Sequence, residues 1–249
     1  MKRLATGTLA LAVVALVGAA TLEAQARPAP AAPPAVPQDA RPGIAVLDFD
    51  IGASLGQDAD TYEALRRGLA AMTIGELAGN PAVRVVERAQ LQQILTEQNH
   101  GREGRVDPNS LVGVGHLIGA RYMVTGTIFD NRGDFRIAAR LFDVETSQIL
   151  RSQMVRGRVD NLFDLVTQLA TQLMRDANLP PLQRAQIEQR EREGTPPTQA
   201  VMAYSRAVLY ADRGDASRAV EQYRRAITAF PNYTRAREEC NRLQAGACT

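Results

Sequence analysis

The sequence predicts an α/β fold in which helices flank a mixed β-sheet, followed by a small α-helical hairpin with a capping helix. Two observations support this fold class. Between residues 43 and 179, runs typical of strands and segments of helical spacing follow one another in the order β-α-β-α-α-β-β-β-α. From residue 198 onward, apolar residues recur only at helical spacing.

The first half of the sheet domain interleaves strands with helices. The run from Ile44 to Phe49 is short and apolar, which is typical of a buried strand. Leu65 and Leu69 in the next segment share one face of a helix, and a Gly-Asn-Pro sequence ends it. The expected elements are a strand at 44–49, a helix at 58–77, a strand at 83–86, and helices at 91–101 and 107–118.

The second half is expected to be three strands joined by hairpins. Phe135, Ile137 and Leu141 alternate with polar or small residues, as in a strand with one buried face. The connections on either side of this strand are short and polar, which suits hairpin turns. The expected elements are strands at 121–129, 135–143 and 148–155, then an amphipathic helix capped by Asp160 and ending before Pro180.

Residues 1–26 have the features of a secretory signal peptide. A basic start and an apolar run lead to the A-x-A pattern at residues 24–26, which predicts cleavage after Ala26. An uncleaved membrane anchor is the alternative, since the run is nearly long enough to cross a bilayer. Residues 27–42 are rich in proline and alanine and are expected to form a disordered linker. No transmembrane segment is expected after the signal peptide is removed.

The C-terminal part is expected to comprise a connecting helix and linker at 180–197 and a helical segment at 198–249. Cys240 and Cys248 both lie near its end. In an exported protein they are expected either to form an intrachain disulfide or to remain as two free thiols.

The composition excludes several classes of function. Lys2 is the single lysine, so the chain without its signal peptide lacks the lysine of a P-loop or a Schiff base. The chain has two histidines and two cysteines, and both cysteines lie near the C-terminus, so a metal site built from histidine and cysteine ligands is not expected. No sequence pattern predicts a cofactor. The formal net charge of +2 gives no electrostatic reason to expect a nucleic-acid partner.

Two aspartates follow the first strand and raise an enzymatic alternative. Asp48 and Asp50 stand as in haloacid-dehalogenase-type phosphatases, where the first carboxylate is a nucleophile, the second an acid/base, and Mg²⁺ lies alongside. That chemistry also uses a lysine. The simpler interpretation is a strand end with solvated carboxylates.

Blocks of the sheet domain resemble the CsgG family, the curli production assembly/transport component and its relatives. The resemblance rests on the order and spacing of the blocks at 44–49, 85–97 and 117–128, with a suitable strand–turn–strand at 141–150. It implies the family's α/β fold and a periplasmic setting for a non-enzymatic protein of the cell envelope.

The chain departs from the channel-forming members of that family. Those members are lipoproteins that insert two long hairpins, whereas here no cysteine precedes Cys240 and five residues separate Phe129 from Phe135. A membrane-crossing strand needs about 9–11 residues, so the membrane-barrel hairpins are expected to be missing. A channel subunit of an outer-membrane secretion complex, with partners supplying the pore, remains as an alternative.

The C-terminal segment resembles one tetratricopeptide repeat (TPR). Small residues, aromatic residues, Gly214 and Pro231 occur in the repeat's order between residues 198 and 231, and 233–243 would be a capping helix. Tyr204, Tyr210 and Tyr223 are candidates for a peptide-binding face. The alternative is that they pack the helix pair internally.

Together these features predict an exported periplasmic interaction or assembly protein of the cell envelope. Association of this protein with the outer membrane is compatible with the same features. Its partners are expected to be envelope proteins, and a homo-oligomer is compatible with the family resemblance. No enzymatic activity is expected.

Overall fold

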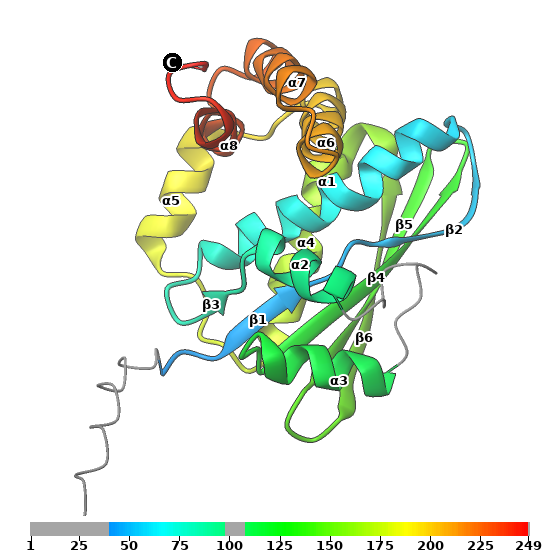
Figure 1. Ribbon diagram of the computed structural model, residues 1–249, viewed down its shortest axis with the longest axis vertical. Helices are drawn as coiled ribbons and strands as arrows, with labels where there is room; N and C mark the ends of the chain where they lie inside the picture. The colour runs from blue at the N-terminus through cyan, green and yellow to red at the C-terminus, as the bar shows by residue number, and fades with distance from the viewer. Residues whose placement is uncertain (1–39, 98–107, 249) are drawn as a thin grey trace, which may run out of the picture. The chain divides into compact units, whose positions relative to one another are not determined.

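The computed structural model describes residues 40–97 and 108–248 (Figure 1). The predicted signal peptide with Ala26, most of the predicted linker and the end of the predicted helix at 91–101 lie outside these residues. In chain order the elements are β1 (Gly43–Val46), β2 (Asp50–Leu55), α1 (Ala59–Ala78), β3 (Arg84–Val85), α2 (Arg88–Glu97), α3 (Pro108–Leu117), β4 (Tyr122–Asn131), β5 (Asp134–Asp143), β6 (Gln148–Arg158), a 3₁₀ turn η1 (Val159–Asn161), α4 (Leu162–Asp176), α5 (Arg184–Glu193), α6 (Thr198–Asp212), α7 (Ala216–Ala229) and α8 (Thr234–Leu243).

The strands form one mixed sheet with the order β3-β1-β4-β5-β6. β1 runs parallel to β3 and β4, while β4, β5 and β6 are antiparallel neighbours. β4 is long enough to pair with β1 over its first residues and with β2 over its last ones, both in parallel. The predicted fold class, a mixed sheet with helices followed by a helical region, is confirmed.

β2 is missing from the predicted elements. The predicted strand at 44–49 leaves the sheet after Val46, and the chain pairs with β4 again from Asp50. The sequence of β2 holds glycine, alanine and serine in place of the β-branched residues that mark most strands. Gly52 fits here because a Cβ at this position would overlap the ring of Phe129 on β4.

A two-residue turn at Arg132 and Gly133 joins β4 to β5. Both residues have positive φ, 54° and 91°, which suits the twist of a tight hairpin. The buried carboxylate of Asp130 supports the turn, since it accepts hydrogen bonds from the Gly133 N–H at 2.7 Å and from the Tyr62 hydroxyl at 2.8 Å. The turn is thereby tied to α1, and the register of the hairpin is fixed.

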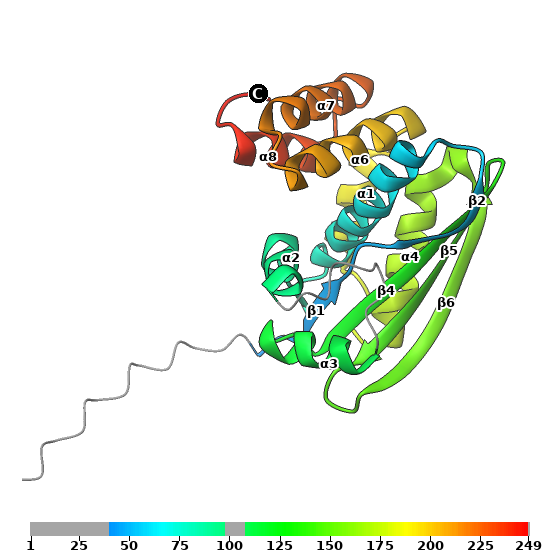
Figure 2. The same ribbon diagram turned by 45° about the vertical axis from the view of Figure 1, so that its right-hand side comes forward.

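Helices α1 and α4 cover one face of the sheet and bury the main core with it (Figure 2). The predicted alternation in β5 is confirmed, because Phe135, Ile137 and Leu141 are buried on this face. The predicted cap at Asp160 is wrong. Asp160 lies inside η1, the N-cap of α4 is Asn161, and the helix begins at Leu162.

Helices α2 and α3 pack on the other face of the sheet, over a smaller core. The strand residues of this core come from β1, the beginning of β4 and the end of β5. That core contains Ala45, Leu47, Val86, Leu91, Leu95, Leu111, Val114, Ile118, Ala120, Met123, Phe142 and Val144. The rest of this face is not covered by helices of the described residues.

The C-terminal helices pack against the sheet domain through α1. α6 packs along α1, α7 on α6 and α8 on α7, as both ribbon views show (Figures 1 and 2). The close approach depends on Gly68, because a Cβ there would lie 2.6 Å from Cα of Ser205 on α6. Both helices contribute to the main core, for example through Leu69 and Tyr204. None of the helices in residues 40–97 and 108–248 combines the length and apolar content needed to cross a bilayer.

Candidate functional site: the open face of the sheet

The part of the sheet that α2 and α3 leave uncovered has a defined layout, and we call it the open face. The register of β4, β5 and β6 arranges its residues in four rows across the strands. The rows are Thr125–Arg140–Ser152, Thr127–Ala138–Met154, Phe129–Arg136–Arg156 and Asn131–Asp134–Arg158.

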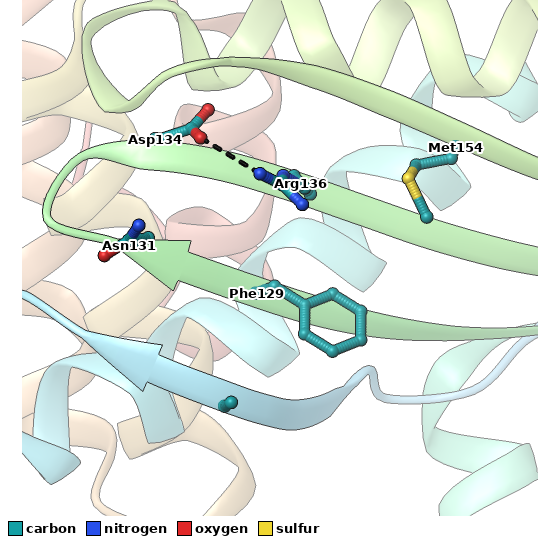
Figure 3. Close-up of a pocket in the computed structure, with 6 residues that line it drawn as sticks. Phe129, Asn131, Asp134, Arg136 and Met154 are labelled. Atoms are coloured by element: carbon teal, nitrogen blue, oxygen red, sulfur yellow. Dashed lines mark hydrogen bonds and ion pairs between the residues drawn. The ribbon is translucent and has the colours of Figure 1, made fainter.

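The open face is hollowed between β2, β4, β5 and β6. This pocket has a volume of about 320 Å³ and is lined by Ala53, Phe129, Asn131, Asp134, Arg136 and Met154. Figure 3 shows the ring of Phe129 and the thioether of Met154 projecting from β4 and β6, with the Arg136 side chain on the strand between them. The pocket therefore has an apolar part and a polar end formed by Asn131, Asp134 and Arg136.

Large apolar side chains are exposed at and beside this pocket. Met154 is 61% exposed, and Leu55, which pairs with Asn131 at the end of β2, is 64% exposed. Single exposed apolar residues are common on protein surfaces. Here they accompany a hollow on a sheet face that the described helices leave uncovered, a combination that indicates a binding surface.

The charges at the polar end centre on Asp134. Arg156 binds its carboxylate in bidentate fashion, at 2.9 and 2.8 Å, and Arg136 approaches the same carboxylate at 3.3 Å. The hydrogen bonds from Arg156 and then Arg136 lower the pKa of Asp134. In turn, the hydrogen bond to the Asp134 carboxylate raises the pKa of Arg156. One carboxylate thus serves two guanidinium groups, so positive charge is left over at this end.

Asp48, the nucleophile in the phosphatase alternative, lies in a network of ion pairs. Its carboxylate receives Arg88 Nη2 at 2.6 Å and lies 3.7 Å from Arg67 Nε. Both arginines also contact Asp212 at the end of α6, at 2.5 and 3.2 Å. Although burial works against its charge, the carboxylates of Asp48 and Asp212 raise the pKa of Arg88.

This network gives Asp48 a structural role, since it joins β1, α1, α2 and α6. A carboxylate held by two guanidinium groups is a poor nucleophile, because they stabilise its negative charge. Asp50 lies on β2, not at the end of the first strand. Among the described residues, no group of three or more histidine, cysteine, aspartate or glutamate side chains is placed to hold a metal ion.

The three tyrosines of the helical segment differ in their surroundings. Tyr204 and Tyr223 are buried, with their ring centroids 5.7 Å apart, and Tyr204 also stacks on Tyr233 at 5.2 Å. These two rings fit the internal-packing alternative. Tyr210 is partly exposed and lies under the guanidinium of Arg218, 4.9 Å from its ring centroid. Of the three side chains, Tyr210 is therefore the least buried.

Cys240 and Cys248 are joined by a disulfide that ties the chain after α8 back to that helix. Both cysteines are buried, and the Asn241 side chain receives the Cys248 N–H at 3.1 Å.

A comparison with protein families covers the first part of the sheet domain. Residues 25–134 match the CsgG family. Its description is curli production assembly/transport component CsgG. The matched residues include the blocks at 44–49, 85–97 and 117–128, and the block at 141–150 lies beyond the match. The resemblance predicted from the sequence is confirmed over this range.

The chain is also similar to several solved structures at low identity. TolB from Acinetobacter baumannii is 14% identical with a TM-score of 0.39, over 56% of this chain and 29% of TolB. The LpoB C-terminal domain from Escherichia coli is 16% identical with a TM-score of 0.36, over 47% of this chain and 82% of that one. A PelC dodecamer from Paraburkholderia phytofirmans is 18% identical with a TM-score of 0.32, over 56% and 90%. A comparison with curated proteins gives no match.

Most of the open face lies on strands β5 and β6, beyond the matched CsgG family domain. The sequence analysis does not single out Phe129, Arg136 or Met154. A usable signal was present, since Phe129 directly follows the buried Ile128 and so points to the outer face of its strand. Large apolar residues at outward positions mark a surface that is not simply solvated.

Proposed function

We propose that this chain is an exported, non-enzymatic interaction protein that acts in assembly at the cell envelope, with the open face as its main partner-binding surface. The observation that carries the proposal is the open face itself, which the helices of residues 40–97 and 108–248 leave uncovered and which holds a pocket lined by apolar side chains and Arg136. The match to a family described as an assembly/transport component supports the assembly role.

The sequence supports the location. The signal-peptide features of residues 1–26 direct the chain to the periplasm, and an association with the outer membrane fits the same hypothesis. The Cys240–Cys248 disulfide suits an oxidising compartment. The non-enzymatic assignment draws on Asp48, whose carboxylate is held by Arg88 and Arg67.

The helical segment at 198–249 is proposed as a TPR-like hairpin with a capping helix that follows the sheet domain at 43–179 and the connecting helix. In this proposal it braces α1 through the Gly68–Ser205 approach and presents Tyr210 as a secondary contact. Self-association into a homo-oligomer remains a prediction, which light scattering of residues 27–249 measures directly.

Site-specific photo-crosslinking in living cells tests the main proposal. A photoreactive amino acid replaces Met154 on the open face in one strain and Ile187 on α5 in the other, because both side chains are well exposed, 61% and 45%. We expect a discrete crosslink to an envelope protein from position 154 and none from 187. The proposal fails if position 154 gives no crosslink, or if both positions give the same one.

A fractionation experiment tests the export part. We expect the chain in the periplasmic or outer-membrane fraction, with a new N-terminus at Arg27. A full-length chain retained in the cytoplasm would contradict this location.

A further inference from the structure

The open face carries an excess of positive charge. β4, β5 and β6 contribute four arginines to it, at positions 136, 140, 156 and 158, and one carboxylate, Asp134. Two more carboxylates lie near its borders: Asp50 on the adjoining β2, and Asp160, which is 3.7 Å from Arg158. With all of these included, arginines still outnumber carboxylates.

Two arginines of the open face, Arg136 and Arg140, can accept further anionic partners. Arg140 is exposed and forms no ion pair with any described residue. Arg136 has only the 3.3 Å contact to Asp134, whose better-aligned partner is Arg156. Guanidinium groups bind carboxylates in planar, bidentate fashion, so this pair presents two sets of donors on the face that holds the pocket.

The pocket on this face suits one apolar side chain. Its walls are the Phe129 ring, the Met154 thioether and the Ala53 methyl group, with the amide of Asn131 at its polar end. Methionine adapts its shape to different apolar groups and makes favourable contacts with aromatic rings. A hollow of this kind is filled by a side chain that projects from a partner, whereas a flat membrane surface does not enter it.

From these observations we propose that the open face binds an acidic segment of a partner protein, which inserts one aromatic or long apolar side chain into the pocket between Phe129 and Met154 and places flanking carboxylates on Arg136 and Arg140. This inference rests on the proposed function and names the chemistry of the partner. A second copy of this chain is a poor occupant through the same face, because a symmetric pairing would bring arginines against arginines.

A peptide titration tests the inference. The chain contains no tryptophan, so a tryptophan peptide can be excited selectively at the long-wavelength edge of indole absorption, where the 6 tyrosines of the chain absorb little. The probe is acetyl-Glu-Glu-Trp-Glu-Glu-amide, added to residues 27–249. We expect saturable binding with a blue shift of the emission, because the indole enters an apolar pocket. The basic peptide acetyl-Arg-Arg-Trp-Arg-Arg-amide is expected not to bind, and acetyl-Glu-Glu-Ala-Glu-Glu-amide is expected to compete only weakly.

Variants then assign the binding to the open face. The double variant Arg136→Gln/Arg140→Gln is expected to bind the acidic probe about tenfold more weakly or worse. Met154→Ser is expected to weaken binding several-fold and to reduce the blue shift. The matched control, Arg184→Gln/Arg225→Gln, removes two exposed arginines from α5 and α7 and is expected to leave binding unchanged.

Three results would overturn the inference. The first is equal binding of the acidic and basic peptides, and the second is unchanged affinity in Arg136→Gln/Arg140→Gln. The third is a preference for another occupant: phosphatidylglycerol vesicles that bind through these arginines while the peptide does not, or a dimer in sedimentation equilibrium that the same variant dissociates. If the peptide fails while position 154 still crosslinks to an envelope protein, the acidic-segment inference falls and the proposed function stands.

Discussion

Gly68 gives the sharpest test of how the helical segment is joined to the sheet domain. In the variant Gly68→Ala, the new Cβ would lie 2.6 Å from Cα of Ser205 and still nearer to its side chain. Ordinary contacts begin at 3.4 Å, so α1 and α6 must separate by about 0.8 Å. Because part of the obstruction is backbone, a change of rotamer cannot relieve it. Overpacking of this kind costs about 3 kcal/mol.

The intrinsic preference of the helix acts in the opposite direction. Alanine is favoured over glycine inside a helix by about 1 kcal/mol, so the net loss expected for Gly68→Ala is about 2 kcal/mol. For a chain of this size that corresponds to a fall in Tm of about 4–8 °C. The assay is thermal and urea unfolding followed by far-ultraviolet circular dichroism.

Gly113 supplies the matched control. It lies within α3, and nothing is within 4 Å of its would-be Cβ. Gly113→Ala is therefore expected to stabilise the chain by about 1 kcal/mol. Ser205→Gly, which removes the side chain in the way, is expected to restore part of the stability of Gly68→Ala. If Gly68→Ala stabilises the chain as much as Gly113→Ala does, the close packing of α6 on α1 is refuted.

Three further predictions follow from the network, the disulfide and the buried tyrosines. Arg88→Gln is expected to lower the free energy of unfolding by about 2 kcal/mol in urea titrations. Asp212→Asn, at the more exposed end of the network, is expected to lower it by about 1 kcal/mol or less. Equal losses in the two variants would contradict this prediction. Cys240→Ser is expected to cost about 2–3 kcal/mol and to abolish any effect of a reducing agent on Tm, and a Tm equal to that of the parent would argue against a contribution from the bond. Burial raises the pKa of Tyr204 from 10.0 to about 12, so its contribution to stability is complete below pH 10 and is lost as the pH rises towards 12. In Tyr204→Phe the free energy of unfolding is expected to fall less steeply with pH over this range. An alkaline unfolding transition equal to that of the parent would contradict the raised pKa of Tyr204.

The regular elements could be predicted from local patterns because each carries its own signal. β5 alternates buried and outward residues, and the apolar stripe of α4 predicts a helix on the core. β2 could not be predicted in this way. Its place depends on β4, which is long enough to pair with two separate strands, and on the contact between Gly52 and Phe129. Neither is visible in the local sequence of β2.

The candidate site was harder to predict because its parts are brought together only by tertiary contacts. Asp48 follows a strand in the pattern of a catalytic acid, yet its surroundings are set by Arg88 and by Asp212, which are 40 and 164 positions away in the sequence. The arginines of β5 occupy outward positions that sequence reasoning treats as solvated. Their significance depends on Met154 from β6 lying beside them, and that requires the register of both hairpins.

The Arg132–Gly133 turn constrains how the open face can change during evolution. Every open-face residue of β4 and β5 has a core residue as its neighbour in the chain. Substitutions can therefore retune the face one side chain at a time, as long as the hairpin keeps its length. A single inserted or deleted residue at the turn would shift the pairing, exchange arginines for core residues on one strand and cost the fold itself. Related chains with different partners are thus expected to differ in the identity of residues such as Arg136 and Arg140, and to keep the length of this hairpin unchanged.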